Sequence, residues 1–431
     1  MKRQAAASSE VQPWTDRIAV NEFVLPNGLR VRLVPSPGAG VTSLYTFFRV
    51  GSRNERPGLT GISHLFEHMM FNGAKKYGPE EFDRVLESHG GQSNAYTSHD
   101  VTVYHEDFPK DALETVLDLE SDRMASLRIS DTVLENERQV VREERRLRVD
   151  NDPMGIVDEE LHALAFQAHA YRWPVIGWMS DIEAIGRADC EAFFRTYYAP
   201  SNATAYLAGD FDADRARALF ERYYRDIPAG PKPPPVTTRE SLQRGPRYGK
   251  VNFPAHAPLF VMAFRGPAAD SVSTLALDIA QFALSVGEGS RLVRELVYKK
   301  KVAVSAQMDW SWRVDPGLLT FYMELAPGAD VRRSEDALLK LLDEVARKGF
   351  TAHEIQKAKN NLRAHAYGEL STQGGRAHAL GNYEMYLGSW KRGLELVDAY
   401  AKISSAEVHR AVREFLSPQL RSVVELVPEA A

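Results

Sequence analysis

The feature that most limits the possible folds of this 431-residue chain is a proline-rich stretch near its middle. Residues 228–235 read P-A-G-P-K-P-P-P. Proline fixes φ and has no backbone N–H, so this run can join neither a helix nor a sheet, and it is typical of a semi-rigid linker. We therefore expect a first domain at 15–227, a linker at 228–245 and a second domain at 246–431.

The hydrophobic patterns on either side of the linker predict strands that are followed by helices. In the first half, Phe23–Leu25 and Leu29–Leu33 flank Pro26-Asn27-Gly28 and read as a hairpin. This order favours an α+β fold with antiparallel-rich layers over a doubly wound sheet. The other predicted elements are strands at Thr42–Val50 and Leu259–Phe264 and helices near Asp111–Ser126, Thr274–Leu284, Ser334–Arg347 and Ala352–Leu370.

Residues 61–73, G-I-S-H-L-F-E-H-M-M-F-N-G, carry the strongest chemical signal. On a helix, His64 and His68 lie one turn apart on one face, and Glu67 lies beside them. Two imidazoles at this spacing can hold one zinc ion, and a neighbouring carboxylate can take a proton from a water molecule. Gly73 is a plausible end of this helix. The alternative interpretation is an ordinary helix with two unrelated histidines.

A second predicted helix, Leu134–Val149, offers a third ligand. Glu137 and Glu144 are seven residues apart, so they share a face, whereas Glu143 points about 100° away. If Glu144 reaches a metal, Glu137 can orient the other ligands. Taken alone, this segment would be a solvated helix with Glu/Arg pairs.

Together these stretches resemble the inverted-motif zinc metallopeptidases, which include pitrilysin, insulin-degrading enzyme and the mitochondrial processing peptidase. That family pairs H-x-x-E-H with a metal-binding glutamate about 75 residues later, in a run similar to E-R-Q-V-V-R-E-E here. The small bacterial members are the most similar. Further family-like stretches are Gly90–Tyr104, His169–Gly177, Tyr197–Ala203 and Gly209–Asp212.

The resemblance implies a role for each matching residue. His64, His68 and Glu144 would hold one Zn²⁺ per chain, Glu67 would be the general base and Glu137 a supporting catalytic acid. The resemblance also implies two similar domains, each a mainly antiparallel sheet with helices on one side, that form half of a clamshell. The implied substrate-binding residues, which would line the cleft, are Asn94, Ala95, Tyr96 and Thr97.

The sequence departs from the family at a second motif. Members with the complete site carry an L-R-x-K-x-x-L-x-Y run whose arginine and tyrosine hold the scissile carbonyl. The matching stretch, 290–306, places Val297 and Val304 at those positions, and neither can donate a hydrogen bond to an oxyanion. Arg294 and Tyr298 are too close together to replace the pair.

We therefore predict a zinc endopeptidase that hydrolyses unfolded peptides inside a chamber. The missing pair indicates a heterodimer, in preference to a homodimer, with a related chain that lacks the zinc motif and supplies the arginine and tyrosine. A non-catalytic structural subunit of a larger complex is the main alternative, and a metal hydrolase of other substrates is a third.

Composition excludes several other classes of protein. A net charge of −5 without a basic block argues against nucleic-acid binding. The single cysteine, Cys190, excludes an intrachain disulfide framework, and no apolar run is long enough for a membrane span. The amino terminus has no apolar core typical of a signal peptide, so we expect a cytoplasmic protein, or a periplasmic one if a leader was removed. His89, His99 and His105 are expected to be structural or to line the cleft. His162 and His169 lie seven residues apart on a predicted helical segment, without an evident third ligand.

Overall fold

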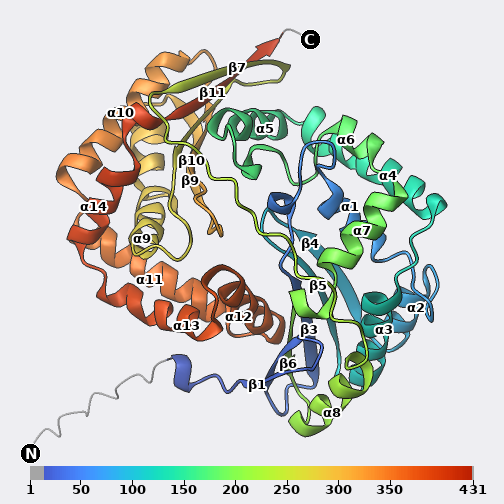
Figure 1. Ribbon diagram of the computed structural model, residues 1–431. Coiled ribbons are helices and arrows are strands. Elements are labelled where there is room, and N and C mark those ends of the chain that lie inside the picture. Colours follow the sequence, from blue (N-terminus) through green and yellow to red (C-terminus); the bar gives the residue numbers. More distant parts are fainter. Residues whose placement is uncertain (1–13, 430–431) are drawn as a thin grey trace, which may run out of the picture.

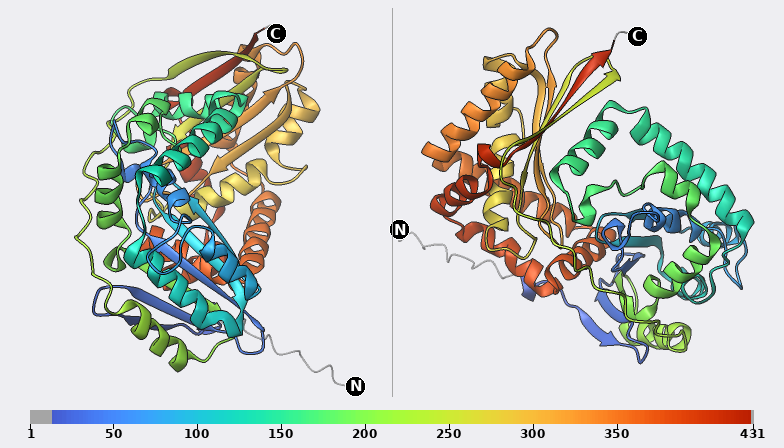
Figure 2. Two further views of the ribbon diagram at one scale, coloured as in Figure 1. Left: turned by 90° about the vertical axis from the view of Figure 1, so that its right-hand side faces the viewer. Right: turned by 45° about the horizontal axis from the view of Figure 1, so that its top comes forward.

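The computed structural model describes residues 14–429 and contains two halves, each built around one sheet (Figure 1). Residues 228–246 join the halves without forming a helix or strand, and they run along one side of the molecule (Figure 2). The predicted lack of a signal peptide concerns residues 1–13, which lie outside the described residues. Within 14–429, no helix is both long enough and apolar enough to cross a membrane.

The first half contains a six-stranded sheet in the order β1-β2-β6-β3-β5-β4. The predicted hairpin is present as the antiparallel pair β1 and β2, and all neighbours are antiparallel except β2 and β6. Strand β4 occupies one edge, so within residues 14–429 one side of its backbone has no neighbouring strand. The strands are β1 (Asn21–Val24), β2 (Arg30–Pro35), β3 (Val41–Phe48), β4 (Gln92–Thr97), β5 (Thr102–Pro109) and β6 (Ala203–Gly209).

Helices of the first half cover one face of this sheet. Leu44 and Phe48 of β3 point into a core that they share with Leu65 and Phe66 of helix α1. Burying these large apolar side chains is the main stabilising contribution in this half. The helices of this half are α1 (Ile62–Met69), α2 (Glu81–Ser88), α3 (Leu113–Ser126), α4 (Asp131–Arg145), α5 (Pro153–Ala165), α6 (Met179–Ala184), α7 (Arg187–Tyr197) and α8 (Ala213–Tyr224).

The second half repeats this plan with a five-stranded sheet in the order β7-β11-β8-β10-β9. Only the pair β7 and β11 is parallel. The strands are β7 (Arg247–Pro254), β8 (Leu259–Arg265), β9 (Ala303–Trp310), β10 (Leu318–Leu325) and β11 (Ser422–Glu429). The helices are α9 (Thr274–Ser285), α10 (Val331–Lys348), α11 (Ala352–Glu369), α12 (Gln373–Leu387), α13 (Trp390–Ala399) and α14 (Ser405–Phe415).

Each half contributes helices that pack on the sheet of the other half. Tyr45 and Phe47 of β3 point away from the first core and pack against Leu380 of α12 and Leu394 of α13. In return, Leu161 of α5 packs on the second sheet. Figure 1 shows α12 beside β3 and α5 beside β11. Each sheet is therefore covered on both faces, and the second cover comes from the other half of the chain.

Two local expectations are wrong. Helix α1 ends at Met69, so Gly73 does not end it. Gly73 instead has φ 93° in the following loop, where a Cβ atom would lie 2.5 Å from the backbone nitrogen of Pro79. His162 and His169 do not share a helix, because α5 ends at Ala165 and His169 precedes a separate short turn.

Candidate metal centre

Helix α1 presents the two histidines and is fixed at its amino-terminal end. The buried carboxylate of Glu55 accepts hydrogen bonds from the backbone N–H groups of Gly61 (2.9 Å) and Ser63 (2.8 Å). These are N–H groups that a helix leaves without partners. Gly61 has φ 88°, and a Cβ atom there would lie 2.3 Å from the carbonyl oxygen of Ile176. The start of α1 is thus held by Glu55 and packs closely against the backbone at Ile176 of the same chain.

Helix α4 presents the third candidate ligand near its carboxyl end. Ser130 caps the start of α4, and the helix continues past Arg145 into a π-helical turn, Arg146–Asp150. Such turns are frequent at functional sites. Glu144 points toward α1, whereas its neighbour Glu143 is exposed and pairs with Arg146. This difference follows the predicted helical periodicity.

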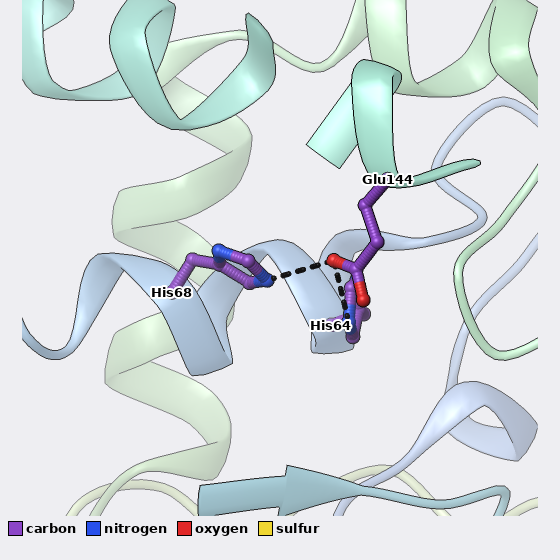
Figure 3. Close-up of side chains that lie close together, drawn as sticks. All are labelled: His64, His68 and Glu144. Carbon is purple, nitrogen blue, oxygen red and sulfur yellow. Dashed lines mark ion pairs between the residues drawn. The ribbon is translucent and has the colours of Figure 1, made fainter. Parts of the chain in front are cut away.

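The side chains of His64, His68 and Glu144 converge in the space between α1 and α4 (Figure 3). The Oε2 atom of Glu144 lies 3.2 Å from His68 Nε2 and 3.6 Å from His64 Nε2. Ligand atoms placed about 2.0–2.2 Å from one tetrahedral zinc ion are about 3.3 Å apart. Two histidines and a glutamate are also a known ligand set of catalytic zinc. The two distances to Glu144 are therefore close to those between ligand atoms of one zinc ion, and all three donor atoms lie within 4.8 Å of one another.

A set of polar contacts holds the candidate ligands in place. Glu137 Oε2 lies 3.4 Å from His68 Nδ1, which leaves Nε2 of that ring directed at Glu144. The Asn72 amide donates to Glu137 (2.9 Å) and to the His68 carbonyl oxygen (3.2 Å). Arg148 Nε lies 3.1 Å from the second oxygen of Glu144. Contacts of this kind fix the orientation of metal ligands.

Asn72 and Arg148 were not singled out from the sequence. Each lies four residues after a candidate ligand, Asn72 after His68 and Arg148 after Glu144. That spacing was the available signal, because it places them on the ligand face of a helix.

The electrostatic environment favours a positive charge between α1 and α4. Burial alone would lower the pKa of His68, but the carboxylates of Glu137 and Glu144 outweigh burial and raise it to about 9. Hydrogen bonding to His68 lowers the pKa of both glutamates. His64 has a pKa lowered to about 4, chiefly by burial and then by the nearby His68. The paired carboxylates suit a site for a cation.

Glu67 lies on the same helix and is largely buried. Its Oε2 atom has no hydrogen-bond donor among the described residues. Burial raises the pKa of Glu67, and the neighbouring Thr97 partly opposes this shift. A buried carboxylate with a raised pKa holds a proton more readily than an exposed one, which suits a group that accepts and then releases a proton.

A cleft of about 310 Å³ opens beside two of the three candidate ligands. It is lined by His64 and Glu144, by Thr97 at the end of β4, and by His99 and His162. The rings of His99 and His162 stack with centroids 5.4 Å apart, so these histidines form a cleft wall, as expected for His99. Their place beside the metal-ligand cluster could not be read from the sequence.

The structure divides the four predicted substrate-binding residues between the two faces of β4. Ala95 packs on the core below α1, and Thr97 lines the cleft beside His64. Tyr96 faces the opposite side, where its hydroxyl group lies 3.0 Å from Nε2 of His378. Asn94 is not part of the lining of this cleft, and its side chain accepts a hydrogen bond from the N–H of Ala95. Only Thr97 is thus brought to the candidate metal centre.

The four residues considered for the missing arginine and tyrosine all lie in the second half. Val297 packs against the second core within the π-helical segment Val293–Lys299, and Val304 is 48% exposed on the edge strand β9. Arg294 pairs with Glu295, and the Tyr298 hydroxyl donates to Glu288. Both polar side chains are thus engaged with carboxylates of their own half.

Comparison with known proteins gives the family. Residues 30–177 match the model of the insulinase family (peptidase family M16), and residues 184–362 match the model of the peptidase M16 inactive domain. The zinc protease PqqE of Helicobacter pylori is 31% identical over 366 residues, which cover 83% of this chain and 82% of that protein. The chain belongs to the M16 peptidase family.

Other M16 proteins match over nearly the whole chain. The mitochondrial-processing peptidase subunit beta of Lentinula edodes is 24% identical over 430 residues, which cover 96% of this chain and 90% of that one. A crystal structure of a protease from Helicobacter pylori superposes with a TM-score of 0.90 at 28% identity and covers 95% of this chain and 100% of its own.

The periplasmic protease PqqL of Escherichia coli shares the fold at 20% identity, with a TM-score of 0.76. This match covers 95% of the M16 chain described here but only 48% of PqqL. These likenesses confirm the predicted architecture, two sheet-and-helix domains that form half of a clamshell.

Proposed function

We propose that this M16 chain is the zinc-bearing subunit of an endopeptidase that cleaves unfolded peptides. The observation that carries the proposal is the convergence of His64, His68 and Glu144 within 4.8 Å of one another, beside the buried carboxylate of Glu67. The similarity to the zinc protease PqqE of H. pylori supports zinc binding and peptide hydrolysis.

In the proposed mechanism, His64, His68 and Glu144 hold the metal and Glu67 moves protons. A bound zinc ion supplies Lewis acidity that lowers the pKa of water and polarises the scissile carbonyl. Glu67 accepts a proton from the attacking water and then passes it to the leaving amine, so it acts as base and then as acid. Glu137 keeps the His68 ring oriented through its 3.4 Å contact with Nδ1.

The free edge of β4 is the proposed docking place for the peptide. An extended peptide can add a strand there through main-chain hydrogen bonds, which do not depend on its side chains. Thr97 lies at the end of this strand and also lines the cleft of His64 and Glu144. A peptide paired with β4 would therefore pass the metal centre.

We propose further that a related partner chain completes the site. Val297 and Val304 cannot stabilise an oxyanion. The chain corresponds in length to about half of PqqL and covers 92% of a structure of the first half of PqqL, at 20% identity. Full turnover by a homogeneous preparation of this chain would contradict the partner proposal and leave the zinc-peptidase proposal intact.

The direct test of the mechanism is the substitution Glu67→Gln. We expect the variant to keep one zinc ion per chain and to lose about 10²–10⁴-fold in kcat, which is the usual contribution of a positioned acid–base group. Cleavage of an internally quenched, unstructured peptide would be measured with the partner present. Unchanged turnover would refute the role of Glu67.

A structural subunit without activity is the second candidate, because the arginine and tyrosine are absent from the matching stretch. The same assay separates the two. A zinc-loaded chain that binds its partner but gives no chelator-sensitive cleavage of any peptide favours the structural role.

A further inference from the structure

A second cavity, of about 590 Å³, lies on the side of β4 that faces away from the candidate metal centre. It is bounded by β4, by the end of β9 and by the three helices α11, α12 and α13, which Figure 1 shows next to one another. Its volume falls in the range of small-molecule and side-chain pockets. Aromatic rings dominate the lining, and these are Tyr96, Trp310, Trp312, Tyr383, Tyr386 and Tyr400.

Contacts outside the cavity fix its aromatic walls. The indole N–H of Trp312 donates to Asp278 (3.2 Å), and the Tyr400 hydroxyl donates to the other oxygen of the same carboxylate (2.6 Å). The Trp310 ring fits against Gly266, where a Cβ atom would lie 2.4 Å from it. The polar ends of Trp312 and Tyr400 are thus held by Asp278, and these contacts fix two of the walls of the cavity.

The polar groups of the cavity are largely satisfied among themselves. Nε2 of His378 lies 3.0 Å from the Tyr96 hydroxyl and 2.9 Å from the amide nitrogen of Asn382. Burial lowers the pKa of His378, so its ring is neutral at pH 7. Arg313 and Glu369 place one positive and one negative charge in the lining, so neither sign of charge in an occupant gains an advantage. The chemistry of the walls therefore fits an apolar, aromatic occupant.

The side chains of β4 alternate between its two faces, and this alternation relates the cavity to the strand edge where the peptide is proposed to bind. Neighbouring side chains on a strand point to opposite faces, and the same holds for a peptide paired beside it. Thr97 points toward the metal centre and Tyr96 toward the aromatic cavity. A peptide residue beside Thr97 would face the metal centre, while its neighbours would face the cavity.

We propose that this cavity is a specificity subsite that binds an aromatic side chain of the peptide within three residues of the cleaved bond. Three residues of extended chain span about 10 Å. The inference rests on the proposed peptidase function, because it needs a peptide at the edge of β4. It adds a preference that the backbone contacts at that edge cannot supply.

The first test maps the contact without requiring turnover. Unstructured peptides would carry the photoreactive residue p-benzoyl-phenylalanine at successive positions and would be irradiated with the zinc-loaded Glu67→Gln chain. We expect crosslinks to residues 310–312 and to α12 for labels at alternating positions. Crosslinks confined to α1, α4 and α5, or to a partner chain, would overturn the subsite.

The second test measures preference by fluorescence anisotropy with two labelled peptides that differ only in phenylalanine or alanine at the mapped position. We expect the phenylalanine peptide to bind about 10-fold more tightly, since a buried aromatic ring contributes at least this much. Ser311→Trp, which places a ring in the cavity lining, should abolish the difference and leave the alanine peptide unaffected. Ser88→Trp, at the exposed end of α2, is the matched control.

These results separate the two proposals. Saturable binding of both peptides with equal affinity overturns the subsite and leaves the peptidase proposal standing. No saturable binding of any unstructured peptide to the zinc-loaded chain overturns the subsite, and the cleavage assay with the partner present decides the peptidase proposal separately.

Discussion

Two glutamates of α4 have different roles at the candidate metal centre, one as a candidate ligand and the other as a support for a ligand. Glu144 faces both histidines, and Glu137, two turns earlier, contacts Nδ1 of His68. We predict that Glu137→Ala keeps the fold but lowers zinc affinity about 10–100-fold, because the His68 ring loses the partner that orients it. Competition with a chromogenic zinc chelator measures this. Glu143→Ala is the control, and equal affinities of the two variants would contradict the supporting role.

Helical spacing alone was sufficient to place Glu137, Glu143 and Glu144 correctly relative to one another. It did not single out Asn72 and Arg148, although both follow candidate ligands at the same four-residue interval. Polar residues on a helix are usually solvated, so a pattern cannot tell which of them meets another helix. That information depends on how α1 and α4 pack.

At the scale of elements, the position of α1 depends on a carboxylate that precedes it. Glu55 accepts two backbone hydrogen bonds at the start of the helix. We expect Glu55→Ala to lower the free energy of unfolding by about 1–3 kcal/mol, since two buried N–H groups lose their partner. Zinc affinity should fall with it, because His64 lies in the first turn of α1. Urea unfolding and chelator competition measure the two effects, and an unchanged variant would refute the positioning role.

The predicted elements agree closely with the structure where periodicity is strong. The helix expected near Ala352–Leu370 is α11 (Ala352–Glu369), and the strand at Leu259–Phe264 is β8. The exchange of α5 and α12 between the halves was not predicted. The apolar run in β3 indicates that both faces of the sheet are buried, but burial does not identify the covering helix. The parallel pairs β2–β6 and β7–β11 join distant segments, and short-range patterns do not encode them.

At the scale of the whole molecule, the halves are joined by a buried charge cluster as well as by exchanged helices. Asp315, in the loop after β9, contacts Arg53 and His169 of the first half and Arg239 of the linker. Burial by itself would raise the pKa of Asp315, but His169 and Arg53 outweigh it and hold the pKa well below its usual range. The Asp315 carboxylate is therefore charged at neutral pH.

We predict that Asp315→Ala destabilises the chain by about 3–5 kcal/mol, because the largely buried Arg53 loses a charged partner. The folded-state pKa of Asp315 is lowered, so its stabilising contribution is present above about pH 4 and is lost as the pH falls further. The difference between wild type and variant in urea unfolding should shrink between pH 5 and pH 3. Asp343→Ala, which removes an exposed pair with Arg347, should cost less than about 0.5 kcal/mol. Equal losses in the two variants would contradict the joining role.

The function proposed for the whole molecule depends first on whether zinc is held by the side chains that converge between α1 and α4. The most direct measurement is the zinc content of the purified wild-type chain and of the adjacent variants Glu144→Gln and Glu143→Gln, determined by elemental analysis after dialysis. We predict one zinc ion per chain in the wild type and in Glu143→Gln, and a large loss in Glu144→Gln. Equal zinc content in the two variants, or no zinc in the wild type, would contradict the assignment of the metal centre.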